Sequence, residues 1–485
     1  MRTTPRKAPL AHRYEIPRAE LRDEGARSVV LGLLAAVAAQ LAVKHVADLA
    51  MKFGTDEALM TVLWTLLFAI ITLEVGLGAR ERPFVITTAD QQQRLDLLKV
   101  VVNIPVHNEC EIALDRALWS LTRQTRVPDV VHVVDDGSTT SRYEQLSEHW
   151  AVEFAALGVD FRWTRTPNQL KRRAQMLTFS QPTDPTDPRE EILVTLDSDT
   201  ALDVAAIEEG LKPFADPGVA SVAGFELAYN MYERGLLTMV GAMAQNIWQL
   251  GTCAALSTTG RVQVNRGTLA FYRSVVFRDR PQEYLDERWF GRRVEFSDDS
   301  RATLTAQRHG RTVQQPSCFQ FTLTPVSWQH ILRQRVRWMR GSQLRDVSRL
   351  RELPWNCYAY WLVYLKWFQF GLASVAVALA AVTVEPTREQ LAYVIGMTLL
   401  LAYLCALRYL MLRRSDESLG QQLLAVAVAP LVVLRSATVF KLVRLYALIT
   451  FLKVQTWGTR GGVEVTAGDG AARAGRPSLI GVEPR

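Results

Sequence analysis

Residues 97–224 alternate between short apolar runs of strand character and amphipathic stretches of helical character. Such alternation predicts a largely parallel sheet with helices on both of its faces. A fold of this class binds its ligands beyond the carboxyl ends of the strands. The predicted strands are residues 97–104, 130–134, 161–163, 192–196 and 219–223, and the predicted helices are residues 110–123, 141–157, 168–180 and 203–214.

Acidic pairs directly follow two of the predicted strands. Asp135 and Asp136 come after the second strand, and Asp197 and Asp199 come after the fourth. The two pairs are therefore expected to face one crevice, where their carboxylates repel each other unless a cation neutralises them. A hard divalent cation with oxygen ligands is the natural partner, and it would bridge a pyrophosphate.

A basic run opens the third predicted helix. Lys171, Arg172 and Arg173 can supply further positive charge to a nucleoside diphosphate leaving group. Taken alone, each motif has an ordinary interpretation: a tight turn at 135–138, a helix cap at 197–199, and a solvated helix face for the basic run. Their occurrence together, in order and at the ends of predicted elements, favours a substrate site.

Two further motifs are Ser297-Asp298-Asp299 and a Gln-x-x-Arg-Trp motif that runs from Gln334 to Trp338. The second falls on a predicted helix with an arginine-rich face, which suits a membrane surface. An anionic-lipid anchor alone is the alternative, but Trp338 favours a saccharide ligand because an indole stacks on the apolar face of a pyranose. Gln334 and Arg337 can hydrogen-bond an acceptor or a pyrophosphate. The arginines of this face are Arg333, Arg335, Arg337, Arg340, Arg345 and Arg349.

Apolar segments long enough to cross a bilayer flank this block on both sides. Basic residues cluster beside them, and the positive-inside rule therefore places the block in the cytoplasm. A cleaved signal peptide, with small residues at 36–38, is the alternative for the first segment. Pro430 and three basic residues interrupt the segment at 421–456, which predicts either one in-plane or re-entrant amphipathic segment or a pair of spans. The predicted spans are residues 28–50, 58–78, 359–383 and 390–411.

The composition is consistent with a cytosolic domain joined to membrane segments. The 485-residue chain has a mean hydropathy of +0.02, and its 56 Lys and Arg exceed its 49 Asp and Glu, mainly beside the apolar segments. This distribution favours phospholipid over nucleic acid as a partner. The five cysteines lie far apart without a Cys-x-x-Cys pair, which argues against a disulfide framework or a zinc site and for a reducing cytosol.

In this order the motifs resemble those of the family 2 inverting glycosyltransferases, and most closely those of the processive membrane synthases of hyaluronan, chitin and cellulose. The Gln-x-x-Arg-Trp motif is the most specific part of the resemblance, which extends from about residue 28 to Arg460. The segment from Trp457 to Arg460 is similar to a further motif of hyaluronan and chitin synthases. The resemblance is carried by residues 103–109, 135–138, 171–175, 197–199, 297–299 and 334–338.

The resemblance implies an α/β GT-A domain, the fold of nucleotide-diphospho-sugar transferases, inserted between transmembrane helices. It also implies a UDP-sugar donor whose uracil contacts Asp136. Asp197 and Asp199 would hold Mg²⁺ or Mn²⁺ on the diphosphate, which Lys171 and Arg172 would flank. The implied donor-site residues are Asp135, Asp136, Lys171, Arg172, Asp197 and Asp199.

The resemblance implies a general base as well. Asp299, with Asp298 beside it, matches the family's base, which takes the proton of the acceptor hydroxyl as the anomeric carbon is displaced in line. A single displacement converts an α-linked donor into a β-linked product. The implied acceptor- and diphosphate-binding residues are Gln334, Arg335, Arg337, Trp338, Trp457 and Arg460.

Two segments depart from the family pattern. Residues 264–273 stand where hyaluronan and chitin synthases usually carry a Ser-Gly-Pro or Cys-Gly-Pro segment near the acceptor, so the choice of acceptor is left open. Ser297 stands where the base motif usually begins with glycine. That change alters the loop backbone without removing Asp299.

The sequence thus predicts a multi-pass plasma-membrane enzyme with a cytoplasmic catalytic domain. It would extend a growing polysaccharide from a UDP-sugar donor and export the product, with aromatic residues at 355–370 forming either a channel lining or an interfacial belt. A transferase of single sugars to a lipid-linked acceptor is one alternative, and a transporter or sensor with an inactive transferase domain is another. The motifs do not discriminate among UDP-GlcNAc, UDP-GlcUA and UDP-Glc, and they leave the oligomeric state open.

The predicted regions follow from these assignments. They are a cytoplasmic tail at 1–27, a transmembrane hairpin at 28–80, the GT-A domain at 81–324, interface helices at 325–354, two transmembrane helices at 355–411, a membrane-interface or transmembrane segment at 412–460, and a disordered tail at 461–485.

Overall fold

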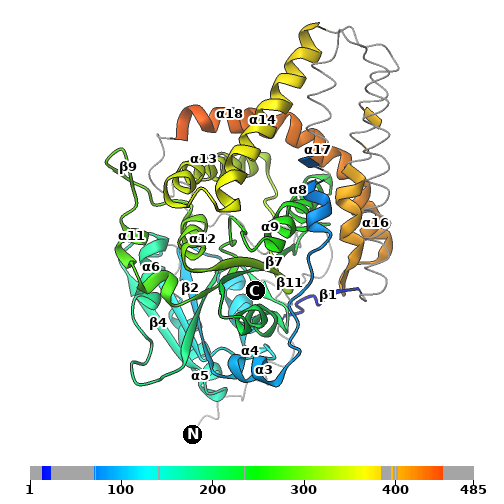
Figure 1. The fold of residues 1–485 in the computed structure, drawn as a ribbon. Helices are drawn as coiled ribbons and strands as arrows, with labels where there is room; N and C mark the ends of the chain where they lie inside the picture. The colour runs from blue at the N-terminus through cyan, green and yellow to red at the C-terminus, as the bar shows by residue number, and fades with distance from the viewer. Residues whose placement is uncertain are drawn as a thin grey trace.

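A computed structural model describes an α/β body with a helical layer above it (Figure 1). The described residues are 14–22, 70–71, 73–139, 143–233, 235–383, 395–396, 399 and 402–451. Most of the predicted hairpin at 28–80, part of the span at 390–411, Trp457, Arg460 and the tail at 461–485 lie outside them.

An eight-stranded sheet forms the centre of the body, in the order β4-β3-β2-β5-β8-β7-β11-β6. β4, β3, β2 and β5 are parallel, as are β7 and β11, whereas β8 runs antiparallel to both of its neighbours. The predicted, largely parallel sheet is therefore confirmed, with antiparallel members in its second half. The strands are β2 (Leu98–Val106), β3 (Val130–Asp136), β4 (Asp160–Thr166), β5 (Glu190–Leu196), β6 (Ala201–Leu202), β7 (Val219–Ala228), β8 (Leu269–Arg273) and β11 (Arg311–Thr322).

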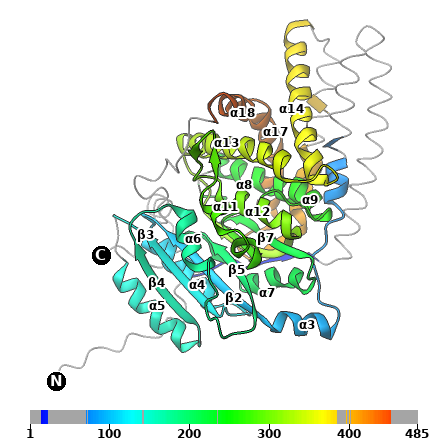
Figure 2. The same cartoon turned by 60° about the vertical axis from the view of Figure 1, so that its left-hand side comes forward.

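Helices cover both faces of this sheet (Figure 2). On β2, Val100 and Val102 enter one apolar core and Val101 enters another, and all three side chains are fully buried. Burial on both faces explains the continuous apolar run of this strand. The covering helices are α4 (Glu111–Thr122), α5 (Glu144–Ala156), α6 (Lys171–Phe179), α7 (Ala206–Leu211) and α12 (Asp298–His309).

Two boundaries differ from the sequence prediction for physical reasons. α6 begins at Lys171, three positions after the predicted start at 168, because Leu170 has a φ of +75° and breaks the helical path. β7 continues to Ala228 because its second half pairs with β11, a partner far along the chain. Neither feature has a local sequence signal.

The helical layer contains α13 (Trp328–Glu352), α14 (Tyr358–Thr383), α16 (Leu419–Ala427), α17 (Ala429–Ala437) and α18 (Val439–Thr450). α13 packs on α18, where Arg340 donates to Thr450 Oγ1 at 2.8 Å and Gln343 donates to the carbonyl of Arg444 at 2.9 Å. α14 projects away from the body (Figures 1 and 2).

One helical stretch among the described residues, Leu419–Thr450, is long and apolar enough to cross a membrane by length and composition. It is not straight, because it breaks before Pro430 and again at Thr438, where φ is −110° and ψ is −85°. The predicted multi-pass topology stays a prediction.

An unpredicted pairing joins segments from opposite ends of the chain. β1 (Ala19–Leu21) pairs antiparallel with β12 (Leu412–Arg414). The backbone N–H of Ala19 also donates to Asp203 Oδ2 at 2.9 Å, and Tyr14 donates to Asp115 at 2.6 Å. Both segments therefore lie against the same α/β body.

The remaining described elements are α3 (Ala89–Asp96), η1 (Lys212–Ala215), α8 (Leu236–Trp248), η2 (Gln249–Cys253), α9 (Ala254–Thr258), α10 (Val275–Arg278), α11 (Pro281–Leu285), β9 (Arg288–Trp289), β10 (Arg292–Arg293) and η3 (Arg408–Met411).

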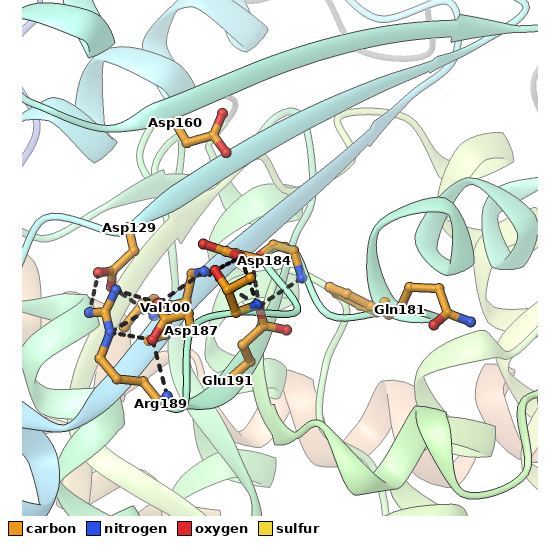
Figure 3. Close-up of polar contacts among 12 residues, drawn as sticks. Val100, Asp129, Asp160, Gln181, Asp184, Asp187, Arg189 and Glu191 are labelled. Atoms are coloured by element: carbon orange, nitrogen blue, oxygen red, sulfur yellow. Dashed lines mark hydrogen bonds and ion pairs between the residues drawn. The ribbon is translucent and has the colours of Figure 1, made fainter.

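Ion pairs secure the amino ends of the strands, at the edge opposite the acidic motifs (Figure 3). Asp129 Oδ2 accepts from the backbone N–H of Val100 at 2.8 Å, and its Oδ1 accepts from Arg189 at 2.8 Å. Asp187 pairs with the same arginine at 2.8 Å and with Lys99 at 3.2 Å. The loop before β5 is thereby attached to β2 and β3.

We expect Asp129→Ala to lower the free energy of unfolding by about 1–3 kcal/mol, because it removes the acceptor of the Val100 N–H and one of the two carboxylates that bind Arg189. Asp160→Ala is the matched control, since its side chain is 48% exposed and pairs with the exposed Arg162, a contact worth less than about 1 kcal/mol. Chemical unfolding of the detergent-purified protein, followed by tryptophan fluorescence, measures both. Equal losses in the two variants would contradict the anchoring role.

Candidate active site

The end of β3 presents two buried carboxylates in fixed positions. Asp135 Oδ1 accepts from the backbone N–H of Ser138 at 2.9 Å, and Asp136 Oδ1 accepts from the backbone N–H of Gln169 at 2.7 Å. Burial raises the pKa of Asp136, against the lowering effect of the hydrogen bond from Gln169. Gly137 has a φ of +72°. The predicted turn at 135–138 is therefore present. The bond from Gln169 to Asp136 joins the end of β3 to the loop before α6.

Lys171 brings three of the motifs together. Its Nζ lies 2.6 Å from Asp197 Oδ1, just beyond β5, and 3.4 Å from Asp298 Oδ2, at the start of α12. Burial acts to lower the pKa of Lys171, but the two carboxylates outweigh it and hold that pKa above its ordinary value. The lysine is therefore a permanent cation shared between two acidic motifs.

A glycine gives this cluster its space. A Cβ on Gly267 would lie 3.0 Å from Lys171 Nζ and 3.4 Å from Asp197 Oδ2. The carbonyl of the next residue, Thr268, accepts from the backbone N–H of Asp197 at 3.4 Å. The segment at 264–273, where the chain departs from the family pattern, thus forms one wall of the site.

The donor set suits Mg²⁺ or Mn²⁺. The side chain of Asp197, beside the lysine, is 31% exposed, and that of Asp199 is also partly exposed. Within the described part of the chain, no group of three or more His, Cys, Asp or Glu side chains is placed to hold a metal. A cation of this kind commonly uses one or two protein carboxylates, with substrate phosphates and waters as its other ligands.

Asp299, the predicted general base, lies beside Asp298 in the first turn of α12. Burial, together with the charge of Asp298, raises the pKa of Asp299 to about 6. Its Oδ1 accepts from the backbone N–H of Ser300 at 2.6 Å, which fixes the carboxylate at the first turn of α12. A carboxylate with a pKa near neutrality can take a proton from a hydroxyl and release it again.

The loop before Asp299 adopts a strained conformation that its serine stabilises. Ser297 has a φ of +59°, which glycine adopts more readily, and its Oγ lies 2.6 Å from Ser300 Oγ. A Cβ on Gly341 of α13 would lie 2.6 Å from Ser297 Oγ. Serine, in place of the glycine usual in the family, therefore leaves Asp299 in position. Gly341 stands where α13 approaches Ser297.

α13 carries the Gln-x-x-Arg-Trp motif to this site. The charge of Arg337 acts on Asp299, whose pKa it lowers against the larger effects of burial and Asp298. The ring of Trp338 is 40% exposed, and Arg335 stacks over it at 4.8 Å from guanidinium carbon to ring centroid. Gln334 is partly exposed on the same helix. The motif therefore lies on the helix that covers the loop ending at Ser297, just before Asp298 and Asp299, which is called the base loop below.

Arg172 has contacts unlike those of its neighbour Lys171. It is buried, and it donates to Glu287 Oε2 at 2.8 Å and to the carbonyls of Tyr284 and Phe296. Arg345 of α13 donates to both oxygens of Glu287, at 2.6 and 3.1 Å, and to Ser300 Oγ at 3.2 Å. These contacts make Arg172 part of the support for the base loop, and its predicted place beside a diphosphate remains a prediction.

The arginine-rich face of α13 is not one membrane surface. Arg345 and Arg349 are fully buried, which makes the prediction wrong for these two residues. Arg349 pairs with Asp346 at 3.2 Å and donates to the carbonyl of Gln263 at 2.6 Å. The arginines have buried partners from distant segments, which a helical pattern cannot reveal.

We expect Glu287→Gln to destabilise the protein by about 3–5 kcal/mol, because it leaves two buried guanidinium groups without a counter-charge. Burial acts to raise the pKa of Glu287, but Arg345 and Arg172 lower it to about 2. The stabilisation is thus present above the ordinary value of 4.5 and is lost as the pH falls towards 2.

Chemical unfolding at several pH values measures this effect. The matched control is Glu295→Gln in the same loop, whose carboxylate lies 3.7 Å from Arg293 and has no buried partner of this kind among the described residues. A Glu287→Gln loss no larger than that of the control would contradict the supporting role.

Comparisons with known proteins show the family that this chain resembles. The family model described as "Glycosyl transferase family 2" matches residues 101–278, and the one described as "Glycosyl transferase family group 2" matches residues 192–411. Together they cover an unbroken stretch that contains every aspartate of the candidate site and the motif on α13.

Relatives and solved structures are consistent with these matches. The hyaluronan synthase of Streptococcus pyogenes is 26% identical over 411 residues, which cover 84% of this chain and 92% of that protein. An N-acetylglucosaminyltransferase of Azorhizobium caulinodans is 29% identical over 265 residues, 54% of this chain and 64% of that protein. A mannosyltransferase from Pyrobaculum calidifontis, solved in complex with GDP-Man and Mn²⁺, has a TM-score of 0.50 at 16% identity and covers 83% of this chain and 99% of its own. The structural likeness confirms a GT-A-like fold.

Proposed function

Because the chain belongs to glycosyl transferase family 2, we propose that it polymerises sugar from a UDP-sugar donor by an inverting, metal-dependent reaction. The reaction would take place at the cytoplasmic face of the plasma membrane, and the polysaccharide would be exported. The acceptor is the end of the growing chain.

The shared contact of Lys171 with Asp197 and Asp298 supports this proposal most directly. It joins the residues proposed to face the donor diphosphate with the loop that carries Asp299. An inverting transfer needs both groups at one reacting carbon, with the base opposite the leaving group. The contact between the two motifs supports the proposal that both groups act at one reacting carbon.

Each side chain has one proposed task. Asp136 and Asp135 position the nucleotide at the end of β3, and Lys171 offers positive charge to the diphosphate. Asp299 takes the proton of the acceptor hydroxyl as it attacks the anomeric carbon. Mg²⁺ or Mn²⁺, held by Asp197 and Asp199, would neutralise charge on the diphosphate when bound.

Polymer formation is supported by the relatives and by the exposed ring of Trp338. The match to the hyaluronan synthase covers 92% of that protein. The exposed indole of Trp338, on the helix above the base, can stack on the last sugar of an acceptor. Addition of a single sugar to a lipid-linked acceptor is the second candidate, since the N-acetylglucosaminyltransferase is named for sugar transfer alone.

We expect membranes that contain the protein to release UDP from at least one of UDP-GlcNAc, UDP-GlcUA and UDP-Glc, offered singly and in pairs. Labelled product of many sugars supports polymerisation, product extended by one sugar supports the second candidate, and a need for two donors indicates an alternating polymer. EDTA should stop release, and added Mg²⁺ or Mn²⁺ should restore it. Failure to bind or cleave any of these donors with metal present would refute the function.

We expect Asp299→Asn to lower the transfer rate by roughly 100- to 10,000-fold while UDP binding is retained, because an amide cannot accept the proton. In the wild type the rate should rise with pH through about 6, since only the deprotonated carboxylate acts as a base. Asp279→Asn, on the surface, is the control. Unaltered turnover by Asp299→Asn would indicate another base, or an inactive transferase domain in a protein of another class.

A further inference from the structure

Glu226 is a carboxylate beside the candidate active site that no motif predicted. It lies on β7, and its side chain is 16% exposed. Thr268 Oγ1 donates to Glu226, and the carbonyl of the same Thr268 accepts from the backbone N–H of Asp197 at 3.4 Å. The carbonyl of Gln263, at the start of the segment from Gln263 to Thr268, accepts from Arg349 of α13 at 2.6 Å. Glu226 is therefore bound by a segment that joins Asp197 to the helix that carries Trp338.

Arg266 and Thr268 hold one oxygen of this carboxylate. Arg266 Nε lies 3.6 Å from Glu226 Oε2, and Thr268 Oγ1 donates to the same oxygen at 3.2 Å. Gln320 donates to Thr268 Oγ1 at 3.0 Å, which orients that hydroxyl towards Glu226. Gln249 fixes the backbone, because its amide bonds both the N–H and the carbonyl of Glu226, at 2.7 and 2.8 Å. The carboxylate is thus held in advance of any ligand.

The pair of Glu226 and Arg266 is not satisfied internally. Among the described residues, no hydrogen bond is made to Glu226 Oε1, and Nε and Nη1 of Arg266 are buried without a hydrogen-bond partner. An ion pair that only stabilises a fold normally forms two parallel hydrogen bonds and leaves few buried atoms unpaired. Unpaired donors and an unpaired acceptor side by side match a ligand whose hydroxyls both donate and accept.

We propose that Glu226 and Arg266 form a subsite that binds the hydroxyl groups of the acceptor sugar, and this inference rests on the proposed function. The position favours the acceptor, because the segment that binds Glu226 joins Asp197 to α13, the helix that carries Trp338. Arg266 and Thr268 also belong to the segment at 264–273, which departs from the family pattern near the acceptor. The substitutions in that segment and Glu226 on β7 therefore act as one specificity-determining unit.

The test compares full-length wild type, Glu226→Gln and Glu226→Ala in lipid nanodiscs. The readout is the amount of labelled sugar incorporated into product per UDP released, with the donor that the wild type uses. We expect this ratio to fall by roughly 10- to 100-fold, the range for lost hydrogen bonds to a charged group, while UDP affinity stays within about twofold. A purely structural role would lower UDP affinity and product together.

Two further variants keep the test decisive. Glu190→Gln is the matched control at the opposite edge of the sheet, where the carboxylate is exposed and pairs with Arg273, and it should keep the wild-type ratio. Thr268→Val removes the orienting hydroxyl without changing charge, and we expect a smaller fall in the ratio even if the Glu226 variants fold poorly.

The outcomes separate the two proposals. A wild type that releases UDP and forms product, with unchanged ratios in the Glu226 and Thr268 variants, overturns the subsite and leaves the proposed function standing. A wild type that releases no UDP from any of the three donors overturns both.

Discussion

The buried cation of Lys171 is the interaction on which the site depends. Without it, Asp197 and Asp298 would place like charges on either side of a short gap, a cost that rises steeply as water is excluded. With it, the end of β5 and the start of α12 are drawn together. Gly267 keeps the gap free of a side chain. One lysine and one glycine therefore set the distance between the two halves of the proposed chemistry.

Two adjacent residues of α6 contact different parts of the candidate site. Lys171 faces the acids of the site, whereas Arg172 faces Glu287 and, through it, Arg345 of α13. Neighbours on a helix point about 100° apart, so one turn can supply both an electrostatic group and its support. The positive φ of Leu170 sets where that turn begins.

The sequence predicts the parts of this site that are local. Alternating apolar runs predict the strands, and the rule that ligands lie beyond carboxyl ends places Asp136 near Asp197, with β2 between their strands. It does not predict Glu226 or Glu287, because each is a single acid whose partners lie far along the chain. It also fails for Arg345, since a helical pattern shows that arginines share a face but not that a carboxylate lies buried beneath them.

α13 joins the chemistry to the helical layer. One face holds the base loop, through Arg345 on Ser300 and the close approach of Gly341 to Ser297. The other face binds α14, where Lys366 and Trp367 both donate to Asp346, at 2.8 and 3.0 Å. α13 is therefore held between the loop before Asp299 and α14, so the position of the predicted base depends on packing in the helical layer as well as on the sheet.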